Sequence, residues 1–209
     1  MKKNEYHHGN LKEEMLKIAF DFIKEHSIEK LTLKVLSDAT NTSRSAIYRH
    51  FKSKDALIET MIIEGFKEFD NAVSPILKDK SIPLKKRFFK SGEAYINFAI
   101  DNPNLYKLLF GKRYAHIREE IINLKNSNSI GFSSLQDAIK EGQKVGLLKK
   151  DNSFNKAILV WSSLHGLSTL IIDGFMDIEK NYKNLYKDLF NNLLFGMVTN
   201  KIRLASVFK

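Results

Sequence analysis

The stretch at residues 32–57 constrains the fold most, because its pattern indicates two short helices separated by a tight break. Thr32 can cap the first helix, where apolar residues recur at three-residue spacing. Asn41 lies in the break, and asparagine is the residue after glycine that best tolerates a left-handed backbone. Ser43 can cap the second helix, whose apolar residues point to one side. The segment therefore predicts two helices joined by a sharp turn.

The outward face of the second helix carries guanidinium, hydroxyl and phenol groups, and no carboxylate lies between Asp38 and Asp55. An ordinary pair of amphipathic surface helices would explain the spacing alone. The makeup of the face instead favours a helix placed in the major groove of DNA, where arginine reads base edges and hydroxyl groups contact phosphates. The outward residues of this helix and its C-terminal end are Arg44, Ser45, Tyr48, Arg49 and Lys52.

Composition limits the remaining possibilities. At 209 residues with 43% hydrophobic residues, the chain is expected to form one or two domains with ample core. The absence of cysteine excludes disulfides and thiolate metal sites, and we expect neither a metal nor a cofactor. No apolar run approaches the roughly 20 residues of a membrane span. The first residues lack the apolar region of a signal peptide, so we expect a cytoplasmic protein that does not bind membranes.

The net charge of +10 indicates an anionic partner, but the excess charge is spread along the chain. Residues 1–55 hold 11 Lys and Arg against 8 Asp and Glu, a net of +3, which leaves +7 for the rest. Only one local cluster of cations therefore points directly to DNA. Its members are Arg44, Arg49, Lys52 and Lys54.

Helical periodicity continues on both sides of this segment. An apolar stripe predicts a supporting helix at 11–26, and another predicts a helix from residue 54 to about 74, ended by Pro75. Residues 2–10 are polar and basic, and fit either an arm that follows DNA or a frayed terminus. Further helices are predicted at 83–100, 104–110, 114–144 (with an irregularity near 127–131), 153–175 and 179–202. The expected fold class is all-α.

The central segment also resembles a known family. Ser43-Arg44-Ser45-Ala46-Ile47-Tyr48-Arg49-His50-Phe51, followed by Ser53-Lys54-Asp55-Ala56-Leu57, is similar to the recognition helix and the next helix start of the TetR family of bacterial regulators. The resemblance extends back to Leu11 and covers about the first quarter of the chain. The sequence departs from the family at Asn41 and Ser27, where glycine is usual, and at Thr42, where valine is usual.

This resemblance implies a fold, a division of the chain and a function. The implied fold is all-α, with a three-helix DNA-binding head at 1–54, a connecting helix at 54–74 and a C-terminal regulatory and dimerisation domain at 76–209. The implied function is that of a transcriptional regulator, most simply a repressor released from a palindromic operator by a small effector. Arg44, Ser45 and Tyr48 would face bases. The groups that would hold phosphates are Thr32, Ser43, Tyr48, His50 and Lys54.

The last two predicted helices, 153–175 and 179–202, are apolar over more of their circumference than one core-facing stripe requires. Such a helix usually has two partners, here a core and a second subunit. Dimers of the resembled family form through their last two long helices, so we expect a homodimer through these segments. The alternative is that 179–202 only covers its own core.

Aromatic residues of the C-terminal part are the candidates for an effector pocket. Trp161-Ser162-Ser163-Leu164-His165-Gly166 is similar to a Trp-x-x-x-His-Gly signature in some members of the family, and residues 102–110 resemble the same subset. His165 could orient a ligand, although a buried aromatic pair with a hydrogen-bonded imidazole is the interpretation that we favour. Core packing explains the aromatic residues as well as an apolar or aromatic effector does. The candidates are Phe88, Tyr95, Phe110, Trp161 and His165.

Two other functions fit parts of the sequence. One is an architectural or cell-cycle DNA-binding factor on the same fold, which would need no small effector. The other is an all-α ligand-binding or catalytic protein whose helix-turn-helix is only structural, and which would bind DNA weakly and without sequence preference. The sequence holds no glycine-rich phosphate loop, no recognisable Ser/His/Asp set and no His-Glu-x-x-His, so we expect no catalytic residues.

Overall fold

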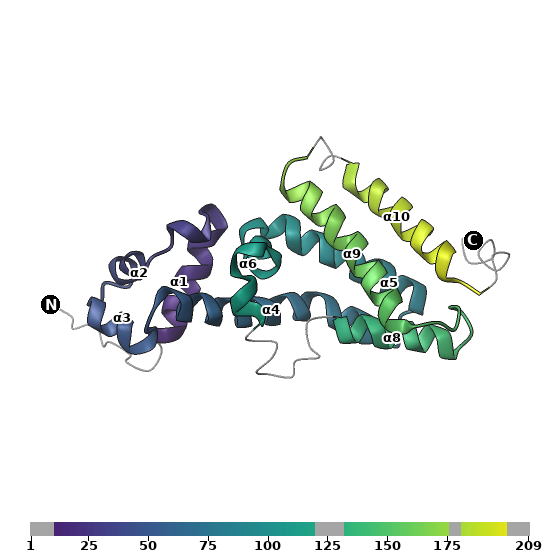
Figure 1. Ribbon diagram of the computed structural model, residues 1–209, viewed down its shortest axis with the longest axis horizontal. Helices are drawn as coiled ribbons and strands as arrows, with labels where there is room; N and C mark the ends of the chain where they lie inside the picture. The colour runs from purple at the N-terminus through teal and green to yellow at the C-terminus, as the bar shows by residue number, and fades with distance from the viewer. Residues whose placement is uncertain (1–10, 120–131, 176–180, 200–209) are drawn as a thin grey trace. The chain divides into compact units, whose positions relative to one another are not determined.

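The computed structural model describes residues 11–119, 132–175 and 181–199, and within these ranges the regular structure is helical except for one isolated β-bridge (Figure 1). The predicted all-α class is confirmed. The elements are α1 (Leu11–Glu25), η1 (Ile28–Lys30), α2 (Leu33–Ala39), α3 (Arg44–His50), α4 (Lys54–Lys78), α5 (Leu84–Asp101), α6 (Pro103–Phe110), η2 (Lys112–Tyr114), α8 (Phe132–Lys144), α9 (Ser153–Ile172) and α10 (Tyr182–Met197). The predicted arm at 2–10 and the irregularity near 127–131 lie outside the described residues.

Contacts divide the described chain into two compact units. The first holds the described residues of Met1–Phe66 together with those of Asn102–Asn126. The second holds the described residues of Lys67–Asp101 and Ser127–Lys209. The segment with α6 and η2 therefore belongs with α1–α3, although it lies far from them in the sequence. None of the described helices combines the length and apolar character that crossing a membrane demands.

The first unit is built on the apolar stripes predicted for α1 and for the two short helices. Met15 of α1, Leu36 of α2 and Ile47 of α3 are fully buried. Helix α1 packs against α2 and also against α6, where Tyr106 is fully buried. Burying large side chains from each helix fixes the orientation of α3, whose opposite side faces outward.

The turn between α2 and α3 forms as predicted. Asn41 has a φ of 50°, in the left-handed region that favours glycine and tolerates asparagine. The Asn41 amide donates to the Asp38 carbonyl at 3.3 Å, and the Thr42 amide donates to the Ser37 carbonyl at 3.0 Å. These two bonds make a Schellman motif, which satisfies the last carbonyls of α2. Ser27 is the other position at which the resembled family usually has glycine. Its φ of −68° is ordinary for any residue, so no glycine is required there.

Helix α4 continues through Pro75 to Lys78, so the predicted end at residue 74 was wrong. Proline removes its own amide hydrogen bond but leaves the following amides able to bond backwards. The Asp79 amide donates to the Pro75 carbonyl at 3.0 Å, and Leu77 is buried. Burial of this last turn therefore outweighs the lost hydrogen bond.

In the second unit, α9 packs against both α5 and α8, and α10 packs against α9 (Figure 1). A core cluster forms around Ile139, Leu148, Ala157, Leu194 and Met197. The predicted helix end at residue 144 is confirmed, since α8 ends at Lys144, and Gly146 follows it with a φ of 74°. Helices α9 and α10 are shorter at their C-terminal ends than the predicted 153–175 and 179–202.

Two local features explain these earlier ends. Gly174 has a φ of 68°, and the Phe175 amide donates to the Leu170 carbonyl at 3.0 Å, so α9 closes with another Schellman motif. At the end of α10, Val198 pairs with Leu148 in the isolated β-bridge. A residue in a bridge has extended backbone, which ends the helix.

Candidate nucleic-acid interface

Helix α3 presents the outward face that its sequence predicts. The Ser43 hydroxyl accepts a hydrogen bond from the Ala46 amide at 3.2 Å and so caps the helix. Ala46 and Ile47 are buried, while Tyr48 is 54% exposed. Because the buried side of the helix is fixed by these residues, Arg44 lies on the exposed side.

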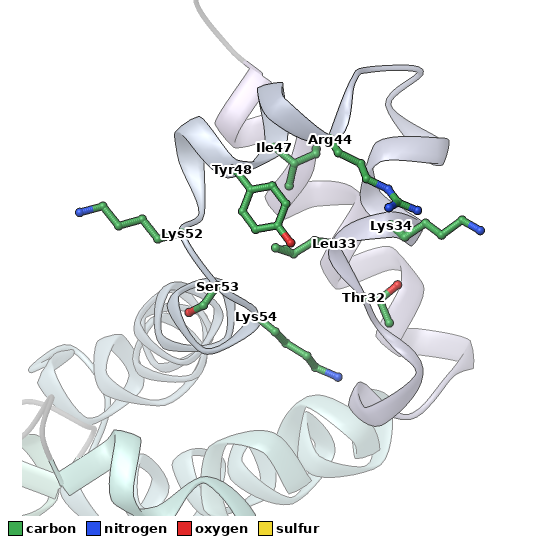
Figure 2. A pocket seen from close by; sticks show the side chains of 9 residues that line it. All are labelled: Thr32, Leu33, Lys34, Arg44, Ile47, Tyr48, Lys52, Ser53 and Lys54. Atoms are coloured by element: carbon green, nitrogen blue, oxygen red, sulfur yellow. The ribbon is translucent and has the colours of Figure 1, made fainter.

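An open pocket of about 510 Å³ lies where α2, α3 and the start of α4 meet (Figure 2). Its lining combines the apolar side chains of Leu33 and Ile47 with four cations, so it suits a group with an apolar part and a negative charge, as a sugar–phosphate backbone has. Figure 2 shows the Tyr48 ring between the three segments, with Lys52 extending away from the other labelled side chains. The lining residues are Thr32, Leu33, Lys34, Arg44, Ile47, Tyr48, Lys52, Ser53 and Lys54.

The structure brings together five of the nine predicted DNA-binding residues in this pocket, namely Thr32, Arg44, Tyr48, Lys52 and Lys54. The other four lie on or next to α3 but do not line the pocket. Ser43 precedes the helix and its hydroxyl lies 2.8 Å from that of Ser45. Arg49 and His50 form the last turn of α3 and are exposed.

Four lining residues were not among the predicted site residues, and two of these, Lys34 and Ser53, are polar. Ser53 accepts a hydrogen bond from the Ala56 amide at 3.1 Å and caps α4. A serine directly before a helical stripe is a recognisable helix start, so this signal was present in the sequence. Lys34 follows the cap of α2 by two positions, but only the packing of α2 against α3 places it at the pocket.

The capping hydroxyl groups at the starts of α2 and α4 are oriented by hydrogen bonds from the backbone. The Thr32 hydroxyl accepts a hydrogen bond from the Val35 amide at 3.1 Å. A capping hydroxyl accepts through its oxygen, which leaves its hydrogen able to donate to a phosphate. The capped starts of α2 and α4 both line the pocket, and the dipole at a helix start favours an anion.

Lys54, the first residue of α4, is held at the pocket by the first unit itself. Its ammonium group donates to the Glu29 carbonyl at 3.0 Å. Burial lowers the pKa of Lys54, and the nearby Glu29 carboxylate opposes this effect. The ammonium therefore has a fixed position and two further hydrogens with which to contact an anion.

The five candidate pocket residues of the C-terminal part do not form one group. The Trp161 indole donates to the Tyr95 hydroxyl at 3.1 Å, and the rings of Trp161 and His165 are 6.2 Å apart. Burial lowers the pKa of His165, which favours the neutral imidazole. Phe88 packs against the core cluster of the second unit, whereas Phe110 contacts Phe66 and Tyr106 in the first unit.

The outer faces of α9 and α10 carry large apolar side chains in contact with solvent. Leu159 and Leu170 of α9 are 50% and 42% exposed. Gly166 lies between them, and a methyl group added there would meet no atom within 4 Å. On α10 the exposed large apolar residues are Leu185 and Phe195. Exposed apolar residues on two neighbouring helices are typical of a surface that binds another protein.

The α2–turn–α3 arrangement and the exposed polar face of α3 define a helix-turn-helix protein. Two family models match the chain. Residues 15–61 match the model described as bacterial regulatory proteins, tetR family, and residues 88–193 match the model described as tetracyclin repressor-like, C-terminal domain. The chain belongs to the TetR family of bacterial regulators, and it is a DNA-binding transcriptional regulator.

Solved structures share the fold. A protein of unknown function from Rhodococcus sp. RHA1 is 20% identical with a TM-score of 0.81, over 94% of this chain and 100% of that chain. The TetR family regulator PfmR from Thermus thermophilus is 18% identical with a TM-score of 0.63, over 86% and 96%. A TetR family regulator from Haemophilus influenzae Rd is 18% identical with a TM-score of 0.65, over 91% and 97%. A comparison with curated proteins found no match.

Proposed function

We propose that the chain is a homodimeric repressor that binds a palindromic operator and leaves it when a small molecule binds the C-terminal domain. Residues 1–54 form the DNA-binding domain, α4 connects, and residues 76–209 form the regulatory and dimerisation domain. The protein acts in the cytoplasm, and it is not an enzyme. The observation that carries the proposal is the cation-rimmed pocket between α2, α3 and α4, next to a recognition helix with an exposed polar face.

The roles of the DNA-binding residues follow from their positions. Arg44, Ser45 and Tyr48 face base edges in the major groove, where arginine gives the most common specific contact. The remaining residues contact the phosphate backbone and set the register of α3 on the duplex. These are Thr32, Ser43, His50, Lys54, Arg49 and Lys52, with Tyr48 able to reach a phosphate as well.

Dimerisation places two recognition helices in successive major grooves. The exposed Leu159 and Leu170 of α9, with Leu185 and Phe195 of α10, support a four-helix interface between two copies. The effector is a small apolar or aromatic molecule, supported by the aromatic groups of Tyr95 and Trp161 and by the imidazole of His165 in the second unit. Its binding favours a head spacing that no longer fits the operator.

A reporter assay tests repression and release together. An operator obtained by selection from random duplex DNA is placed between a promoter and a reporter gene, and the wild-type protein is compared with Arg44→Ala. We expect the wild-type protein to reduce reporter output and the variant to leave it unchanged. A panel of aromatic and aliphatic compounds is then screened for restored output. Increased output with the wild-type protein would contradict the repressor role, and a panel without effect would count against release by an apolar effector.

A further inference from the structure

Glu29 connects Lys54 with an arginine that lies far away in the sequence. The Lys54 ammonium donates to the Glu29 carbonyl at 3.0 Å. The Glu29 carboxylate lies 3.3 Å from the guanidinium of Arg113, in η2. All three residues belong to the first unit. One residue of the short η1 turn thus contacts a cation of the DNA face through its backbone and a second cation through its side chain.

The segment that carries Arg113 is held against the same turn by another side chain. The Asn104 amide group donates to the carbonyls of Ile23 at 2.9 Å and His26 at 3.3 Å, at the end of α1. The last carbonyls of a helix need partners from outside it, and the asparagine supplies such a partner at this end of α1. Arg113 also lies over the Tyr114 ring, 5.8 Å from its centroid. Arg113 therefore has a defined position relative to Glu29.

Without a cation beside it, the Glu29 carboxylate would disfavour DNA binding. A negative charge near the pocket repels phosphates, and it attracts the ammonium group that should contact them. Arg113 lies beside the Glu29 carboxylate and balances its charge. The Glu29 carbonyl can then orient the Lys54 ammonium, while the neutralised carboxylate does not draw the ammonium away from a phosphate.

We propose that Arg113 is a positioning residue for DNA binding, because it neutralises Glu29 and so keeps the Lys54 ammonium available to a phosphate. This inference rests on the proposed phosphate contact of Lys54. It assigns to η2 a part in DNA affinity, although Arg113 itself contacts no DNA.

The test measures sequence-independent binding, because phosphate contacts do not require an operator. The probe is a labelled mixed-sequence duplex about three helical turns long, and affinity is measured as a function of salt concentration. The variants of the full chain are Lys54→Gln, Arg113→Gln and Glu29→Gln, with the double variant Glu29→Gln/Arg113→Gln. The control is Lys112→Gln, which removes the same charge from the neighbouring exposed residue. Circular dichroism verifies that each variant is folded.

We expect Lys54→Gln to weaken binding and to reduce the slope of log K against log salt by about one. Arg113→Gln should weaken binding by about two- to fivefold and reduce the slope in the same direction. Lys112→Gln should change neither quantity. In the Glu29→Gln background, Arg113→Gln should have no effect, because the charge that it balances is already gone.

Three results would overturn the inference. If Arg113→Gln weakens binding equally in the Glu29→Gln background, Arg113 contacts DNA directly or acts through its overall charge. If Arg113→Gln has no effect while Lys54→Gln does, the coupling through Glu29 is absent but the proposed role of Lys54 stands. If Lys54→Gln changes neither affinity nor slope, the proposed phosphate contact itself is wrong, and the inference fails with it.

Discussion

The two units place their charged and apolar side chains in opposite ways. In the first unit, Arg44 lines an open pocket while the apolar side of α3 is buried. In the second unit, Arg87 is only 3% exposed, while Leu159 and Leu170 of α9 are exposed. A side chain acts on a partner only where the partner can reach it. We infer that the first unit binds a charged partner and that the second binds an apolar surface.

The buried arginine shows how the second unit uses its charge internally. The Arg87 guanidinium donates to the Leu77 carbonyl at 2.8 Å and to both carboxylate oxygens of Glu141, with Lys80 pairing to the same carboxylate. These bonds join the last turn of α4 to α5 and α8. Arg44 of the first unit is exposed instead, so its charge is open to a partner.

The largest effect is expected from charging the exposed apolar face of α9. Leu159→Asp with Leu170→Asp should convert the dimer to a monomer, because two buried carboxylates per subunit would oppose association. Operator affinity should fall about 100-fold or more, since the two half-sites are then bound independently. Sedimentation velocity and DNA titration measure the two quantities.

A matched control separates this face from general surface effects. Val145→Asp changes an apolar side chain that is also exposed but lies outside α9 and α10. It should leave both the association state and the operator affinity unchanged. A double variant of α9 that remains dimeric would show that the exposed leucines do not form the interface.

The next largest effect is expected at the buried ion pair. Glu141→Ala leaves Arg87 buried without its carboxylate partner and should lower the free energy of unfolding by about 2–3 kcal/mol, somewhat less than for a fully buried pair because Glu141 is partly exposed. Chemical denaturation measures the difference. Asp21→Ala, which removes an exposed carboxylate paired with Lys24, should have no measurable effect.

The Arg87–Glu141 pair should also make the free energy of unfolding depend on pH. The hydrogen bond from Arg87 is the main cause that lowers the pKa of Glu141 from 4.5 to about 2. A depressed carboxyl pKa stabilises the fold fully above the unfolded value and loses this contribution as pH falls toward the folded value. The stability difference between wild type and Glu141→Gln should therefore be constant near neutral pH and shrink between pH 4.5 and about 2. A difference that is independent of pH in this window would contradict the pairing.

A smaller effect is expected for the exposed arginine of the first unit. Arg44→Ala should weaken operator binding by about 1–3 kcal/mol and relax base preference at one position, with no change in thermal stability. Lys144→Ala, an exposed lysine at the end of α8, is the control and should bind as wild type does. If Arg44→Ala instead lowers stability and leaves DNA affinity intact, the division of roles between the two arginines is wrong.

The smallest effect is expected at the turn that orients α3. Asn41→Ala keeps the β-carbon but removes the short polar side chain that helps asparagine tolerate a left-handed conformation, and it should cost about 1 kcal/mol of stability. Asn41→Gly should be neutral or slightly stabilising, because glycine adopts this φ without strain. Thermal unfolding of the two variants measures the contrast. Equal destabilisation by both would mean that the asparagine side chain, and not the backbone, holds the turn.

Features determined by neighbouring residues could be predicted from the sequence. The turn at Asn41, the caps at Thr32 and Ser43, and the outward face of α3 depend on interactions within a few positions, and the structure has each of them. The end of α4 could not be predicted in this way, because the burial of Leu77 decides whether the helix continues past a proline.

Features that depend on distant residues required the structure. The Arg87–Glu141 pair spans 54 positions, and the Lys54–Glu29 contact spans 25. Phe110 illustrates the same limit, since it was a candidate for the same effector pocket as Trp161 but its segment packs in the other unit. Periodicity shows which side of a helix is buried and does not show which partner covers it.

Selection of bound sequences from random duplex DNA by the purified protein, at physiological salt, tests whether the protein is a sequence-specific dimeric regulator. We expect a palindrome whose half-sites are about one helical turn or somewhat more apart, because two recognition helices are related by the two-fold axis of a dimer. Failure of a folded, dimeric protein to enrich any sequence would contradict a sequence-specific regulator and favour a helix-turn-helix with only a structural role.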